Sequence, residues 1–217
     1  MQYQVSQIFP AALYHGRVDI SDSERTTLVD RLIYESNSTS VNELSVNYNL
    51  QLVQDDDLIS IHNKIQQHVD SFVYDTLKVC SDAMTAKIIG SWTLKTRPGE
   101  SQAEHHHRNS MLSGVLYVNS EKGSGDIIIN GDHRDHKTFD LSVEPTYDAT
   151  TIYNQWLVPF TPVTGDIIIF PSYYKHGVSV NRTNSVRCSM AFDVYLEGDR
   201  NSTSQDVFYC LGSISEQ

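Results

Sequence analysis

The stretch that decides the fold is residues 165–178, GDIIIFPSYYKHGV. A turn at Gly165 leads into an apolar run typical of a buried strand, Pro171 ends that run, and a second strand carries His176. Other short segments rich in β-branched and aromatic residues are punctuated by Gly, Asn, Asp and Pro, at residues 86–95, 110–119, 125–130 and 186–195. Many short strands with turns between them predict a β-sandwich or barrel.

Helices are expected only in the first third of the chain. One helix is predicted over residues 24–36, because Ser21 or Asp22 can cap its start. A second is predicted over residues 55–79, because apolar residues recur there at helical spacing. A short strand is predicted over residues 3–9.

These patterns predict one mostly β (α+β) domain that spans residues 1–217. Helical support over residues 20–80 is expected to pack on one sheet of a β core over residues 86–195. No internal repeat interrupts this division of the chain.

The connection over residues 131–160 shows no firm pattern of strand or helix. A lid over a binding site and a disordered insert both fit such a segment. As a lid it would line the site with Tyr153 and Trp156. Its histidines, His133 and His136, are interpreted as loop surface residues, with substrate contact as the alternative.

Composition limits the partners that this chain can have. The formal net charge is -11 and the Lys and Arg residues do not cluster, which disfavours nucleic acid and anionic membrane surfaces. No apolar stretch reaches the roughly 18–20 residues of a membrane span, and the start does not look like a signal peptide. Three cysteines without a CxxC pair indicate reduced thiols, so we expect a cytoplasmic protein.

Histidines provide the first candidate site. In the string EHHHRNS, residues 104–110, strand alternation places His105 and His107 on one face and His106 on the other. Two imidazoles on one face can bind a metal ion, although a solvated surface patch is the alternative. His176 alone is more simply a core residue, but with His105 and His107 it fits metal ligands on adjacent strands of a barrel.

A second candidate group follows His176 along the chain. Arg187 and Ser189 share a strand face that excludes Cys188, and a two-strand hairpin would bring them near the metal pocket. Arginine suits bidentate capture of a carboxylate, and the serine hydroxyl adds a hydrogen bond. The alternative is an arginine at a strand end that reaches solvent.

Three segments together resemble the 2-oxoglutarate/Fe(II)-dependent oxygenases. They are SWTLKTRPGESQAEHHHRNSMLSGVLYVN (91–119), GDIIIFPSYYKHGVSVN (165–181) and SVRCSMAFDV (185–194). They are most similar to a largely uncharacterised bacterial and phage branch with an H-x-H...FPS-x-x-x-H...R-x-S pattern. The resemblance implies a double-stranded β-helix, a jelly-roll or cupin-like barrel, with N-terminal helices packed on one sheet.

The same resemblance implies roles for individual residues. His105 and His176 would bind iron. Arg187, assisted by Ser189, would bind the distal carboxylate of 2-oxoglutarate, and Tyr117 is a further candidate for a hydrogen bond to this co-substrate.

The chain departs from the superfamily at two positions. Most members have Asp or Glu two residues after the first histidine, where this chain has His107. Either His107 completes a three-histidine site that is one charge more positive, or a water or Glu104 takes its place. Alternation disfavours Glu104, because it puts that side chain on the face opposite His105. Arg108 stands where the branch usually has Pro.

The resemblance therefore implies an Fe(II)- and 2-oxoglutarate-dependent dioxygenase of the hydroxylase type, which consumes O2, with ascorbate as an optional reductant. Its substrate would be a small molecule or a peptidyl residue, with an amino acid or a prolyl residue favoured. A homodimer is left open. Two alternatives are a non-oxygenase cupin-like metal-binding protein and a non-catalytic jelly-roll binding module. Neither alternative would need Arg187 and Ser189 to bind 2-oxoglutarate.

Overall fold

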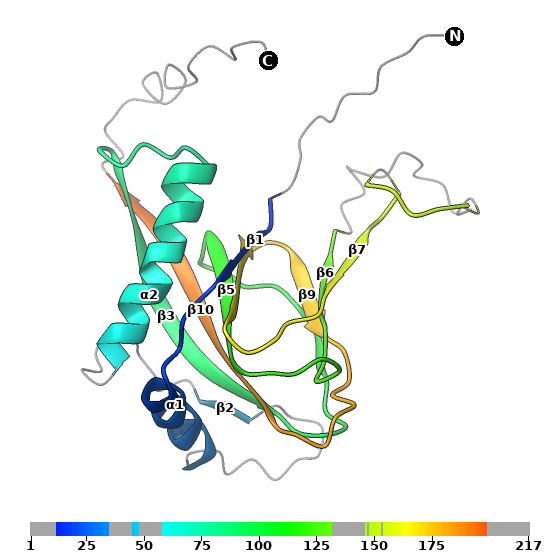
Figure 1. The fold of residues 1–217 in the computed structure, drawn as a ribbon. Helices are drawn as coiled ribbons and strands as arrows, with labels where there is room; N and C mark the ends of the chain where they lie inside the picture. The colour runs from blue at the N-terminus through cyan, green and yellow to red at the C-terminus, as the bar shows by residue number, and fades with distance from the viewer. Residues whose placement is uncertain are drawn as a thin grey trace.

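The protein is described by a computed structural model, which covers residues 12–34, 45–47, 58–131, 146, 148–152 and 154–198. Within these residues two antiparallel sheets form the opposite walls of a barrel (Figure 1). The larger sheet has the order β1-β8-β5-β10-β3-β2, and the smaller sheet has the order β4-β9-β6-β7.

The strands of the larger sheet are β1 (Tyr14–Arg17), β2 (Ser45–Asn47), β3 (Met84–Thr96), β5 (Leu112–Asn119), β8 (Asp166–Pro171) and β10 (Arg187–Gly198). The smaller sheet contains β4 (Gln102–His105), β6 (Ile127–Asn130), β7 (Leu157–Phe160) and β9 (Lys175–Val178). From β3 onward the chain passes repeatedly from one sheet to the other. This antiparallel arrangement is the predicted double-stranded β-helix.

Three strands, β1, β2 and β7, were not expected from the sequence. β1 is short and half polar, and it becomes a strand through its pairing with β8, from Tyr14 opposite Ile169 to Arg17 opposite Asp166. β7 lies in the stretch without a firm pattern and forms the exposed edge of the smaller sheet. An edge strand tolerates Pro159, which lacks the N–H that a central strand would use.

The helices cover the outer face of the larger sheet (Figure 1). α1 (Asp22–Tyr34) packs on β3 and β5, and its start is fixed by a capping box. In that box the Glu24 N–H donates to Ser21 Oγ over 3.2 Å, and the Ser21 N–H donates to Glu24 Oε2 over 2.8 Å. Ser21 is thus the cap.

The second predicted helix is shorter than expected. α2 (Ile59–Asp70) continues as a π-helical turn, η2 (Ser71–Thr76), and residues 55–57 and the predicted strand 3–9 lie outside the described residues. The apolar face of α2 is fully buried against the larger sheet through Ile61, Ile65 and Val69. No helix in the described part of the chain is long and apolar enough to cross a membrane.

β10 separates the two interiors of the molecule. Its alternate residues Cys188, Met190 and Phe192 join the core beneath the helices. Arg187 and Ser189, which alternate with them, line a pocket inside the barrel instead. The expected hairpin is wrong: His176 lies in β9 of the smaller sheet, whereas β10 pairs with β3 and β5 of the larger one. Arg187 therefore approaches the histidines from the opposite wall.

Candidate metal centre

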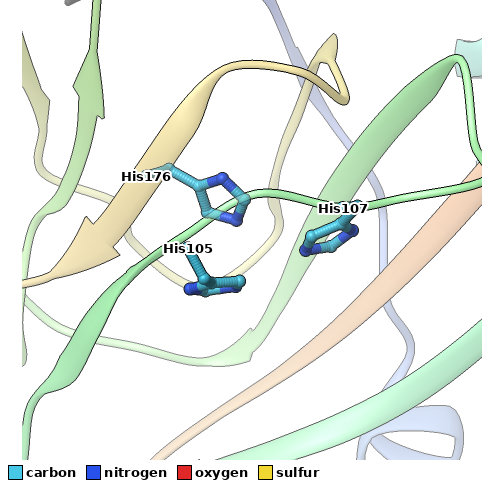
Figure 2. Close-up of side chains that lie close together, drawn as sticks. All are labelled: His105, His107 and His176. Carbon is cyan, nitrogen blue, oxygen red and sulfur yellow. The ribbon is translucent and has the colours of Figure 1, made fainter.

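Three histidines converge inside the barrel (Figure 2). One possible ligand atom from each of His105, His107 and His176 lies within 4.8 Å of the others. His105 ends β4 and stands directly opposite His176 of β9 in the strand register. His107 lies beyond the end of β4, so its position comes from the loop, where its N–H donates to Ser172 O over 3.1 Å. His106 is exposed.

Each of these histidines has an acceptor at its Nδ1 atom. His105 Nδ1 lies 3.0 Å from Ala103 O, and His176 Nδ1 lies 3.1 Å from Tyr174 O. His107 Nδ1 lies 2.7 Å from Asp193 Oδ1. Because a carbonyl or carboxylate oxygen only accepts, the proton belongs on Nδ1 and Nε2 carries the lone pair. At His105 the Nε2 atom lies 3.5 Å from Gln102 Nε2, a long contact that a metal ion would replace. Such outer hydrogen bonds fix histidine ligands in metal sites, so this donor set fits a divalent metal such as iron.

Burial keeps two of the imidazoles in the neutral form that binds metal. It lowers the pKa of His176 to about 3 and also lowers the pKa of His105. Since the ordinary histidine pKa is about 6.5, both rings are uncharged at neutral pH. A metal then does not have to displace protons from them.

Glu104 is not part of this group. Its carboxylate accepts a hydrogen bond from Asn130, and it is absent from the cluster of potential ligands. Among the described residues, the group that can share an ion therefore consists of three histidines without a carboxylate.

The pocket beside the histidines contains a buried cation. Arg187 is only 3% exposed, and burial lowers the pKa of its guanidinium. Its Nη1 donates to Gly125 O over 3.1 Å, while Nε has no hydrogen-bond partner among the described residues. No described carboxylate forms an ion pair with it. Because an uncompensated buried charge is costly, the pocket is suited to an anion.

Ser189 and Tyr117 stand beside this guanidinium. They pair across β10 and β5, and both are 1% exposed. The Arg187 Cζ atom lies 5.6 Å from the centroid of the Tyr117 ring. The structure thus brings the six predicted site residues around one pocket, whose other lining side chains include Trp92, Leu94, Gln102, Val115, Ile127, Phe170 and Val178.

Sequence reasoning missed Asp193, which holds His107. Alternation along β10 places residue 193 on the same face as Arg187 and Ser189, and this signal was available in the sequence. The proposed lid residues His133, His136 and Tyr153 lie outside the described residues. Trp156 is described and is 43% exposed, outside the pocket lining.

Comparisons with known proteins agree with this geometry. Residues 90–193, which include all six predicted site residues, match a family described as putative 2OG-Fe(II) oxygenase. The chain has no match among curated proteins.

Solved structures share the fold at low sequence identity. The α-ketoglutarate-dependent epimerase SnoN from nogalamycin biosynthesis has a TM-score of 0.59 at 12% identity, over 90% of this chain and 84% of that one. A Pseudomonas putida prolyl-4-hydroxylase has a TM-score of 0.53 at 14% identity, over 84% and 92%. A 2OG-Fe(II) oxygenase family protein from Burkholderia pseudomallei has a TM-score of 0.54 at 15% identity, over 84% and 83%.

The barrel fold and the cluster of His105, His107 and His176 agree with this family match. Over residues 90–193 the chain is therefore similar to the 2-oxoglutarate/Fe(II)-dependent oxygenases.

Proposed function

We propose that the protein is an Fe(II)- and 2-oxoglutarate-dependent dioxygenase that hydroxylates an amino acid or a peptidyl residue such as proline. The observation that carries this proposal is the buried Arg187, which has no carboxylate partner in the described structure and lines the same pocket as the three histidines. A pocket with both a metal face and an unpaired cation suits a co-substrate that chelates metal at one end and carries a carboxylate at the other.

In this proposal His105, His107 and His176 would hold Fe(II) through their Nε2 atoms. Fe(II) held there would supply, with 2-oxoglutarate and O2, the oxidising power for C–H hydroxylation, and ascorbate would serve only to keep the metal reduced. The protein residues bind, orient and shield these reactants.

The pocket walls account for the orientation of the co-substrate. The Arg187 guanidinium, with the Ser189 and Tyr117 hydroxyls beside it, would bind the distal carboxylate of 2-oxoglutarate. The buried side chains Leu94 and Phe170 would keep bulk water away from the reacting end.

Substrate and setting are extensions of the proposal. One structural neighbour is a prolyl-4-hydroxylase and another an epimerase from nogalamycin biosynthesis, so the fold alone does not choose a reaction. We favour a small or peptidyl substrate handled in the cytoplasm, by a monomer or a homodimer. The overall acidity disfavours a nucleic-acid substrate.

The test is the visible charge-transfer band of the Fe(II)–2-oxoglutarate chelate, recorded without O2 on untagged protein. We expect the band in the unmodified protein and in Arg182→Ala, a control that removes an exposed arginine between β9 and β10. Arg187→Ala should abolish or strongly weaken it. Iron binding without a band would favour the cupin-like metal protein instead, and failure to bind any metal would favour a non-catalytic binding module.

A further inference from the structure

We propose that Asp193 is a positioning residue for His107. Through its hydrogen bond to the His107 ring it would place a negative charge near the metal, in the role that a carboxylate ligand has in most of the superfamily. The inference rests on the proposed function, because it assumes that His105, His107 and His176 hold the metal. Asp193 would contact the ligand residue His107 and would not contact the metal.

The contact between Asp193 and His107 is short and sheltered. Asp193 Oδ1 lies 2.7 Å from His107 Nδ1, and the two side chains are 17% and 10% exposed. Asp193 does not belong to the group of side chains that can share one ion. The carboxylate therefore lies on the far side of the ring, with the His107 Nδ1–H donating to it and Nε2 facing the other two histidines.

A chain of serine hydroxyls orients the carboxylate. Ser110 Oγ donates to Ser172 Oγ over 2.9 Å, and Ser172 Oγ lies 2.8 Å from Ser113 Oγ. Ser113 Oγ donates to Asp193 Oδ1 over 2.8 Å and lies 2.9 Å from His107 Nδ1. When Ser172 donates to Ser113, every hydroxyl in the chain points its proton toward Asp193. The network thus fixes the position of the Asp193 carboxylate against His107.

The surroundings of His107 leave its ring little freedom. The Trp92 ring packs beside the His107 ring, with the centroids 5.2 Å apart. The backbone N–H of His107 donates to Ser172 O. His105 is fixed by its pairing with β9, but His107 lies past the end of β4. The position of His107 therefore depends on these contacts. Asp193 and Trp92 together define where Nε2 points.

The charge of the site explains why a carboxylate is useful there. Three neutral imidazoles leave a bound divalent metal one charge more positive than two histidines and a carboxylate. The other two ligands have backbone carbonyls at Nδ1, Ala103 O and Tyr174 O. Asp193 is thus the one described carboxylate that hydrogen-bonds a ligand of this site, and such a contact raises the basicity of the imidazole.

The experiment compares Asp193→Asn with Glu104→Gln. Both changes remove one negative charge without changing side-chain size, but Glu104 bonds Asn130 and does not contact a ligand histidine. The probe is Co(II) alone, titrated into metal-free protein and followed calorimetrically. We expect Asp193→Asn to weaken Co(II) binding about 10- to 100-fold. Glu104→Gln should change it less than about twofold, because exposed charges are screened.

A spectroscopic readout separates this role from a merely structural one. With Fe(II) and 2-oxoglutarate, the charge-transfer band of Asp193→Asn should move to shorter wavelength than that of Glu104→Gln, because the iron loses electron density. Ser113→Ala retains the charge and removes its orienting bond. It should weaken Co(II) binding by a smaller factor, and it decides the question if Asp193→Asn does not fold.

The possible outcomes distinguish the two proposals. Equal Co(II) affinity in Asp193→Asn and Glu104→Gln overturns the inference and leaves the oxygenase assignment standing. Weaker binding in Asp193→Asn, with no 2-oxoglutarate band even in the unmodified protein, upholds the role of Asp193 at a metal site and overturns the co-substrate assignment. If the unmodified protein does not bind Co(II), both proposals fall.

Discussion

Replacing Arg187 by methionine should have opposite effects on co-substrate binding and on stability. Methionine retains the apolar stem of the side chain and removes the charge. Each hydrogen bond from a cation to a carboxylate contributes about 1.5–3 kcal/mol, and a guanidinium can donate two. The loss of about 3–6 kcal/mol corresponds to a roughly 10²- to 10⁴-fold weaker binding of 2-oxoglutarate.

Without 2-oxoglutarate the same change should stabilise the protein. The guanidinium is buried and has no carboxylate partner among the described residues, and an uncompensated buried charge costs several kcal/mol. Against this gain, Gly125 O loses its donor, which costs about 1–3 kcal/mol. We expect a net gain on the order of 1 kcal/mol, or a rise in melting temperature of roughly 2–4 °C for a chain of this size.

The assay is thermal unfolding with and without 2-oxoglutarate, next to a titration of the charge-transfer band. Arg182→Met, at an exposed arginine, serves as the control and should leave both measurements close to the unmodified protein. Saturating 2-oxoglutarate should raise the melting temperature of the unmodified protein and not that of Arg187→Met. A variant that melts lower than the unmodified protein without 2-oxoglutarate, and still binds it, would refute the reasoning.

Three further predictions follow from other contacts. Gly114→Ala places a Cβ 2.1 Å from Phe192 Cζ in the central strands, so it should destabilise the fold by about 1–3 kcal/mol or prevent folding, measured by thermal or urea unfolding. Tyr117→Phe removes one hydroxyl near Arg187 and should weaken 2-oxoglutarate binding about 2- to 10-fold in the band titration, while no change would exclude Tyr117 from co-substrate binding. Burial raises the pKa of Glu24, but hydrogen bonds from Lys64, Ser21 and Ser60 lower it by more. The pKa of Glu24 is therefore about 2. The stabilisation is therefore present above pH of about 4.5 and is lost as the pH falls toward 2, so Glu24→Gln should abolish this part of the pH dependence of unfolding.

Much of the fold was predictable because it depends on local patterns. Alternation and turn residues predicted the positions of β3, β5, β6, β8, β9 and β10, and the cap at Ser21 predicted the start of α1. β1 and β7 could not be found in this way. β1 is too short to show a pattern, and it is a strand because β8 offers it an unpaired edge.

For the site, the sequence determined which side chains share a strand face. The separation of Arg187 from Cys188 along β10 follows from the alternation of side chains. The pairing of His105 with His176 depends on the register of β4 against β9. The approach of Arg187 to the histidines from the opposite sheet is visible only in the folded chain. The tertiary structure also decided that His107 is held beyond its strand by Asp193. These contacts join residues far apart in the chain, and they depend on sheet closure and strand register, which no local pattern encodes.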